Sequence, residues 1–103
     1  MIGYVGSMPG KVFNEKEFTL VKKVLASGET IEKHNHPGFT VLVTIVKGEI
    51  KVLLNDEEDR EFEPGKVLKF DGENYISIEA VKSSEFFVTL IKKCDYHESS
   101  FIR

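Results

Sequence analysis

The sequence predicts an all-β fold, a sandwich or barrel of short strands, from two observations. Turn signals built on glycine and proline recur about every eight to twelve residues and separate segments rich in β-branched and aromatic residues. No stretch of a dozen residues repeats its apolar side chains with the 3.6-residue period of a helix. Short strands joined by tight turns at this spacing are typical of β-sandwiches and barrels.

Length and composition indicate a single domain. They also argue against nucleic acid or an anionic membrane as a binding partner. Its 103 residues, 41% of them hydrophobic, suffice for a single core. A net charge of −3 provides no field that would gather nucleic acid or an anionic membrane. Cys94 is the single cysteine, no signal peptide is evident, and no apolar run approaches the ~20 residues of a membrane helix. We therefore expect a cytoplasmic protein.

The first half of the chain divides into an arm and four strands. Residues 1–17 are interrupted by glycines and a proline, and we expect a loose N-terminal arm or an edge strand, with a single barrel domain over residues 18–103. Strands are expected at 18–26, 30–36, 39–46 and 50–54. The run 39–46 alternates its β-branched residues with period two, which indicates a strand.

The second half continues the same pattern. Residues 55–63 carry many acidic side chains without the ordering of a calcium loop, and they are interpreted as a solvated hairpin tip. Strands are expected at 67–70, 75–81 and 85–91. The last of these is apolar on both faces, which is typical of a central strand. The tail with Cys94 and His97 has no clear period and is expected to form a short strand or a half-turn.

Two histidines mark the candidate site. His34 and His36 lie one residue apart between turn signals, and alternate residues of a strand point to the same face. Their imidazoles are therefore expected to point inward together, close enough to share one ion. The pair is equally consistent with two neutral imidazoles in the core, because burial disfavours their charged form.

Around these histidines the chain resembles the cupin superfamily. The first cupin motif is a glycine, five residues, His-x-His, three or four residues, a glutamate, six residues and a glycine; Gly28, His34, His36 and Gly48 match it. Gly65 matches the opening glycine of the second motif. The resemblance covers about residues 18–92 and implies a small jelly-roll β-barrel. It also implies a divalent transition metal (Mn, Fe, Zn or Ni) held by the two histidines, the glutamate and a histidine of the second motif.

Two of these four ligand positions carry apolar residues here. Val41 stands at the glutamate position and Ile76 at that of the second-motif histidine. Glu32 and Tyr75 are the candidate substitutes. However, Glu32 and His36 would lie ~13 Å apart on an extended strand, and a phenol with a pKa near ~10 is a poor ligand at neutral pH.

Replacing half of the metal site by apolar residues favours a pocket for a small molecule. Val41, Phe70 and Ile76 would contribute to its wall, because two polar groups in an apolar lining are typical of such pockets. The sequence therefore predicts a small-molecule binder with a partly degenerate metal site. It leaves open a metal-dependent dioxygenase or isomerase with a substituted third ligand, and a non-catalytic regulatory or structural partner protein. The family often dimerises, so a homodimer contacted by the N-terminal arm is expected.

Overall fold

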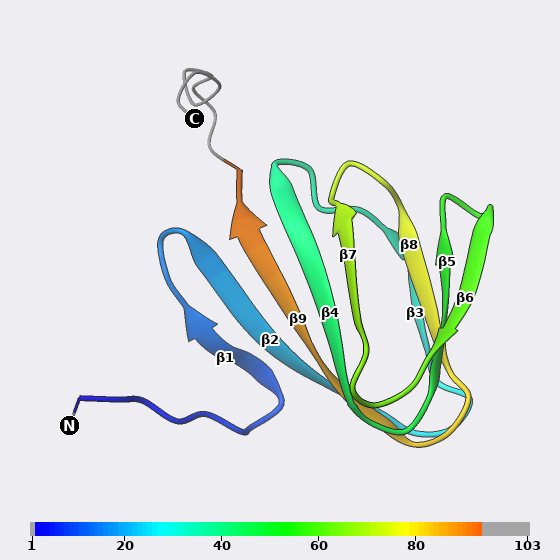
Figure 1. Cartoon of the computed structure of the whole chain (residues 1–103), viewed down its shortest axis with the longest axis horizontal. Helices are drawn as coiled ribbons and strands as arrows, with labels where there is room; N and C mark the ends of the chain where they lie inside the picture. Colours follow the sequence, from blue (N-terminus) through cyan, green and yellow to red (C-terminus); the bar gives the residue numbers. More distant parts are fainter. Residues whose placement is uncertain (1, 94–103) are drawn as a thin grey trace.

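The computed structural model describes residues 2–93 and confirms the all-β expectation (Figure 1). Every regular element in this range is a strand, and no helix there is long and apolar enough to cross a membrane. The predicted tail around Cys94 and His97 lies outside the described residues. The strands are β1 (Gly10–Asn14), β2 (Phe18–Leu25), β3 (Thr30–His34), β4 (Phe39–Lys47), β5 (Ile50–Leu54), β6 (Glu58–Phe62), β7 (Val67–Asp71), β8 (Ile76–Ala80) and β9 (Ser84–Lys92).

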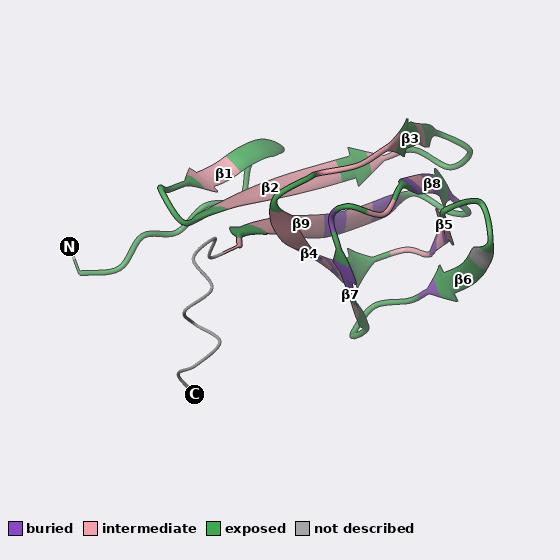
Figure 2. Cartoon of the chain, turned by 90° about the horizontal axis from the view of Figure 1, so that it is seen from above, coloured by how far each residue is buried: buried purple, intermediate pink, exposed green. Residues whose placement is uncertain are grey.

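The strands form two antiparallel sheets with jelly-roll connectivity. A five-stranded sheet has the order β1-β2-β9-β4-β7, and a four-stranded sheet has the order β3-β8-β5-β6. Seen from above, the sheets enclose a core on the side of β4, β5 and β8, while β1 and the residues before it extend beyond the enclosed part (Figure 2). Strand β9 lies between β2 and β4, so the central position expected from its two apolar faces is confirmed.

The core is built from the period-two alternation of the central strands. Alternate residues of β4, β5 and β8 are buried, while the residues between them are more exposed. Ile50 and Phe86 are completely inaccessible to solvent. The buried hydrophobic side chains are Val41, Val43, Ile45, Ile50, Val52, Phe62, Phe70, Ile76, Ile78, Ala80 and Phe86.

The acidic segment 55–63 is only partly the solvated tip that its composition suggested. The turn is confined to residues 55–57, where Asn55 and Asp56 adopt positive φ angles of 55° and 58°. Asparagine and aspartate tolerate this left-handed region better than most residues. The chain then continues as β6, whose Phe62 is buried and pairs with Ile50 of β5. The many charged residues of the segment suggested full exposure, but the buried Phe62 side chain holds β6 against the core.

The N-terminal residues form an edge strand preceded by an extended arm. β1 pairs only with β2, and the register shifts between Lys11 and Phe13. Before it, residues 2–9 have no regular secondary structure and are exposed. Lys22 of β2 donates a 2.9 Å hydrogen bond to the Ser7 carbonyl oxygen, which holds the base of the arm against the outer face of the sheet.

Candidate functional site

His34 lies at the end of β3, where an irregularity turns its ring toward the core. The pairing of β3 with β8 places Ile31 opposite Ile78 and His34 opposite Ile76, so β3 contains one residue more than its partner. Paired residues share a face of the sheet, and Ile76 is buried, so His34 faces inward. Its Nδ1 lies 2.7 Å from the Glu32 carbonyl oxygen. A carbonyl only accepts, so Nδ1 carries the proton and Nε2 keeps its lone pair.

His36 follows β3 in the loop that leads to β4. The expected strand 30–36 ends two residues earlier than predicted, at His34, so backbone contacts fix His36 instead of a sheet ladder. Its N–H donates to the Gly72 carbonyl oxygen at 2.8 Å, and the Gly72 N–H donates to the Phe39 carbonyl oxygen at 2.8 Å. A Cβ at position 72 would lie 2.1 Å from the His36 carbonyl oxygen, so only glycine allows this approach.

The two imidazoles meet edge to face in a geometry that suits a shared metal ion. Their Nε2 atoms are 3.1 Å apart, and the ring centroids are separated by 4.8 Å with planes at 90°. A metal–nitrogen bond of about 2.0–2.1 Å places two ligand nitrogens roughly 2.9 Å apart at 90° and roughly 3.4 Å apart at a tetrahedral angle. The observed separation falls between these limits. The Nδ1 contact of His34 with a carbonyl is also the outer-shell bond typical of metal-binding histidines.

The surroundings of His36 favour its neutral form by lowering its pKa. Burial lowers the pKa of His36 below its ordinary value of 6.5, and the nearby His34 and Lys23 lower it further. The neutral imidazole is the form that accepts a hydrogen bond or binds a metal. Without a metal, one Nε2 must donate to the other, and the Nε2 lone pair of His34 makes His36 the donor.

The structure brings no carboxylate to the histidine pair. Within residues 2–93 no group of three or more His, Cys, Asp or Glu side chains could hold a metal ion. Glu32 is exposed and lines a cleft on the outer face of the four-stranded sheet, together with Lys51 and Glu79. Tyr75 is 44% exposed and lies beside Lys33, whose Nζ is 5.5 Å from the ring centroid. The register irregularity in β3 removes the common face that alternation suggested for Glu32 and His34.

The residues predicted to line a pocket are part of the packed core. Val41 is 1% exposed and Ile76 3% exposed, and both belong to the main hydrophobic cluster. Ile76 is the direct pairing partner of His34, so the position of the cupin second-motif histidine adjoins the pair. Phe70 pairs with Val41 and lines a cleft between β6 and β7.

Two residues that shape the site were missed in the sequence. Lys23 pairs with the buried Phe86 and therefore faces the interior from β2. Lys23 alternates with Thr19 and Val21, which indicated an inward position. The adjacent Lys22 and Lys23 instead suggested that one face of the strand is exposed to solvent. Gly72 had no signal beyond its place in a turn, because its contact with His36 spans 36 residues of sequence.

Comparisons with known proteins identify the fold through structure alone. No protein-family model and no curated protein matches the chain. An RmlC-like cupin family protein from Methanocaldococcus jannaschii, with a double-stranded β-helix fold, is 25% identical and superposes with a TM-score of 0.78, covering 89% of this chain and 93% of that protein. A cupin superfamily protein from Desulfitobacterium hafniense is 14% identical, with a TM-score of 0.76 and coverages of 89% and 84%. The Cupin_2 domain of an XRE family transcriptional regulator from Enterobacter cloacae is 18% identical, with a TM-score of 0.67 and coverages of 76% and 84%.

Proposed function

Because the chain is a small cupin-superfamily protein with a double-stranded β-helix fold, we propose that it binds a small molecule inside the barrel beside an incomplete divalent-metal site. The observation that carries this proposal is the 3.1 Å separation of the His34 and His36 Nε2 atoms. Two imidazoles leave several coordination positions of a transition metal open, and these suit water or the donor atoms of a ligand. The Cys94 thiol, the only one in the sequence, supports a cytoplasmic location as part of this proposal.

The chain's own residues determine what this site can do. The Glu32 carbonyl orients the His34 ring, and the contact with Gly72 orients His36. Bound Mn²⁺, Fe²⁺, Zn²⁺ or Ni²⁺ would supply Lewis-acid polarisation of a coordinated oxygen. Val41 and Ile76 make the neighbouring core apolar, which supports weak metal retention. Two protein ligands bind less tightly than the three or four of ordinary protein zinc sites.

Metal titration tests the proposal. We expect little metal after gentle purification and a small rise in melting temperature with added Zn²⁺ or Ni²⁺, abolished by His34→Ala. Glu32→Gln is the matched control, because it removes a carboxylate on the outer face and should leave the response unchanged. The absence of any response in the parent, or its persistence in His34→Ala, would contradict a site at the histidine pair.

Two rival functions are separated by the same titration. A large metal-induced stabilisation in the parent, lost in His34→Ala, would mean that a third ligand exists and would favour a metal-dependent dioxygenase or isomerase. A protein without any metal or small-molecule response would fit a regulatory role. The similarity to a cupin domain of a transcriptional regulator supports keeping that alternative.

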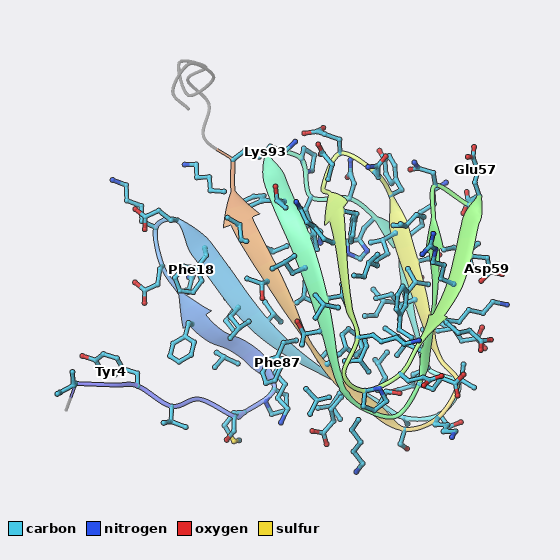
Figure 3. All side chains as sticks on the ribbon, viewed as in Figure 1. Tyr4, Phe18, Glu57, Asp59, Phe87 and Lys93 are labelled. Carbon is cyan, nitrogen blue, oxygen red and sulfur yellow. The ribbon has the colours of Figure 1, made fainter. Side chains whose placement is uncertain are left out.

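We also propose that two copies associate through the outer face of the five-stranded sheet. Phe18, Val24, Val67 and Ile91 alternate with inward residues on β2, β7 and β9 and are 37–55% exposed. Figure 3 labels Phe18 and Phe87 on this sheet and Tyr4 on the arm beside it. Exposed apolar side chains on one face of a sheet are common at interaction sites in soluble proteins, and here the Lys22–Glu85 ion pair lies among them.

The size of this face supports a second copy as its occupant. Strands about 4.8 Å apart with about 3.3 Å per residue give this sheet an area of roughly 600 Å². A standard interface takes ~800 Å² from each partner. The arm supplies the remainder, because Ile2, Tyr4, Val5 and Met8 are 75–99% exposed. A two-fold arrangement would pair identical faces and let each arm contact the other copy.

Light scattering tests the association. The parent should have twice the mass of the chain at micromolar concentration, and Val24→Lys should reduce it to that of one chain. Val81→Lys is the matched control, because Val81 is 42% exposed and lies just after β8, outside the five-stranded sheet. A monomeric parent, or a Val24→Lys variant that still dimerises, would reject this interface.

A further inference from the structure

The inner face of the five-stranded sheet is closed over β4 and half open over β2. Across this face, Val43 of β4 pairs with Val88 of β9, and Val88 pairs with Val21 of β2. Val43 is 1% exposed, whereas Val88 and Val21 are half-buried, and most of β2 shares this intermediate burial (Figure 2). The interior of the barrel therefore becomes accessible to solvent beside β2.

A lysine stands on this half-open surface. Lys23 pairs with Phe86, which is completely buried, so both side chains lie on the inward face of the sheet. Lys23 is two residues from Val21, on the same face, and is itself half-buried. It therefore adds a cation to the apolar surface that Val21, Val88 and Leu90 form on the inner side of β2 and β9.

No carboxylate of the described chain neutralises this cation. Within residues 2–93, Lys23 forms no ion pair, and its ammonium donates no hydrogen bond to another residue. Other lysines of this range differ, because each is paired with a carboxylate: Lys22, Lys33, Lys51 and Lys93. The inward-facing positions of segments 19–25, 41–45, 76–80 and 84–90 also contain no aspartate or glutamate.

The histidine pair lies close to this cation. After burial and the neighbouring His34, the charge of Lys23 is a further cause of the lowered pKa of His36. Charges that solvent can reach are largely screened from one another beyond ~10 Å at ordinary ionic strength. Lys23, from β2, and His36, from the loop after β3, therefore border the same part of the interior.

An unpaired ammonium beside apolar side chains favours a carboxylate as its partner. A charge pair is stronger in half-buried surroundings than on the surface, because the effective dielectric constant is lower there. The neighbouring valines and Leu90 add favourable apolar contact for a ring or a short aliphatic chain. Packing alone would need only the methylene stem of Lys23, which can cover apolar surface without the charge.

We propose that the ligand inside the barrel is a small organic anion, a carboxylate carried on a compact apolar ring or chain. The carboxylate pairs with the Lys23 ammonium, and the apolar part lies on Val21, Val88 and Leu90. This inference rests on the proposed function, because it names the ligand class of the pocket beside the histidine pair. Lys23 is then the residue that selects an anion over an uncharged molecule of the same shape.

Amide chemical-shift titration with benzoate, and with uncharged benzamide as its isostere, tests this assignment. A chelator is present throughout, so the result does not depend on a metal at the histidine pair. Benzoate should shift the signals of β2 and β9 in a saturable way at millimolar concentration. Benzamide should bind the parent roughly tenfold more weakly than benzoate does, the loss expected for one charge-assisted pair.

Substitutions of Lys23 separate its charge from its packing. Lys23→Met retains an apolar stem without the charge and should bind benzoate roughly tenfold more weakly than the parent. Lys23→Arg retains the charge and should bind it within about threefold of the parent. Lys51→Met is the matched control, since Lys51 lies on the outer face of β5 within 3.7 Å of Asp59, and should bind as the parent does.

Three outcomes would overturn the proposal: no saturable shift, equal binding of benzoate and benzamide, or unchanged binding in Lys23→Met. If Lys23→Met does not fold, Lys23→Gln replaces it, and weaker binding is again expected. Equal binding of the two probes would reject the anion but leave a small-molecule pocket in place. A missing metal response in the separate metal titration would reject the histidine site alone, so the two failures are distinguishable.

Discussion

Substituting Gly72 by alanine directly tests the backbone contacts that position His36. The added Cβ would lie 2.1 Å from the His36 carbonyl oxygen and 2.6 Å from that of Phe39, whereas real Cβ contacts essentially never fall below 3.0 Å. Both obstacles are backbone atoms and cannot rotate away. The loop must therefore move by roughly one ångström, a displacement that a close-packed interior resists.

This movement breaks two hydrogen bonds, from the His36 N–H to the Gly72 oxygen and from the Gly72 N–H to the Phe39 oxygen, each 2.8 Å long. Their net loss at ~0.5–1.5 kcal/mol each, together with residual strain, gives a destabilisation of ~2–3 kcal/mol. The Nε2 separation of the histidine pair would change as well. Gly72→Ala should therefore lose both stability and the metal response.

Urea unfolding with Gly3→Ala as the control measures this effect. Gly3 lies in the arm, and a Cβ there meets nothing within 4 Å, so its substitution should change stability by less than ~0.5 kcal/mol. A Gly72→Ala variant that unfolds at the same urea concentration as Gly3→Ala would refute the close approach of the two loops, and with it the account of how His36 is held.

Three further outcomes follow from the structure. The pKa of His36 is lowered in the folded protein, so the unfolded state binds more protons below about pH 6.5. The free energy of unfolding should therefore fall as the pH drops through this region. In urea titrations at several pH values, His36→Gln should reduce this dependence of stability on pH. The double variant Val41→Glu, Ile76→His should lose ~1–3 kcal/mol per substitution in chelator and regain stability with Mn²⁺, Fe²⁺ or Zn²⁺, as melting curves would reveal. Ser84→Ala should cost ~1–3 kcal/mol in urea unfolding, because the buried Ser84 hydroxyl accepts from the Glu49 N–H at 3.0 Å and donates to the Lys82 carbonyl oxygen at 2.7 Å.

The fold was readable from the sequence because the strands depend on local patterns. The alternation of Val41, Val43 and Ile45 predicted β4, and the two apolar faces of residues 85–91 predicted a central strand. The misinterpreted segment was 55–63, where a single buried aromatic, Phe62, outweighs the surrounding charges. Composition averages over a window, whereas strand formation depends on which face each residue occupies.

The site was less predictable because it depends on contacts between distant segments. The spacing of His34 and His36 predicted that their rings would meet, and they do. Alternation also suggested that Glu32 lies on the same face as the pair, but one extra residue in β3 turned Glu32 outward. No local pattern encodes such a register shift. The cleft between β6 and β7 could not be predicted from a local pattern either, because the segments 54–60 and 68–74 that line it come together only in the folded chain.

The position of β9 between β2 and β4 bears on how the protein forms during synthesis. β2 pairs with β9 along all eight of its residues, yet Phe18 meets Ile91 across more than seventy intervening residues. The middle of the larger sheet therefore cannot assemble until β9 has left the ribosome. Folding dominated by such distant pairings is slow, and until β9 arrives, the apolar edges of β2 and β4 stay exposed to aggregation.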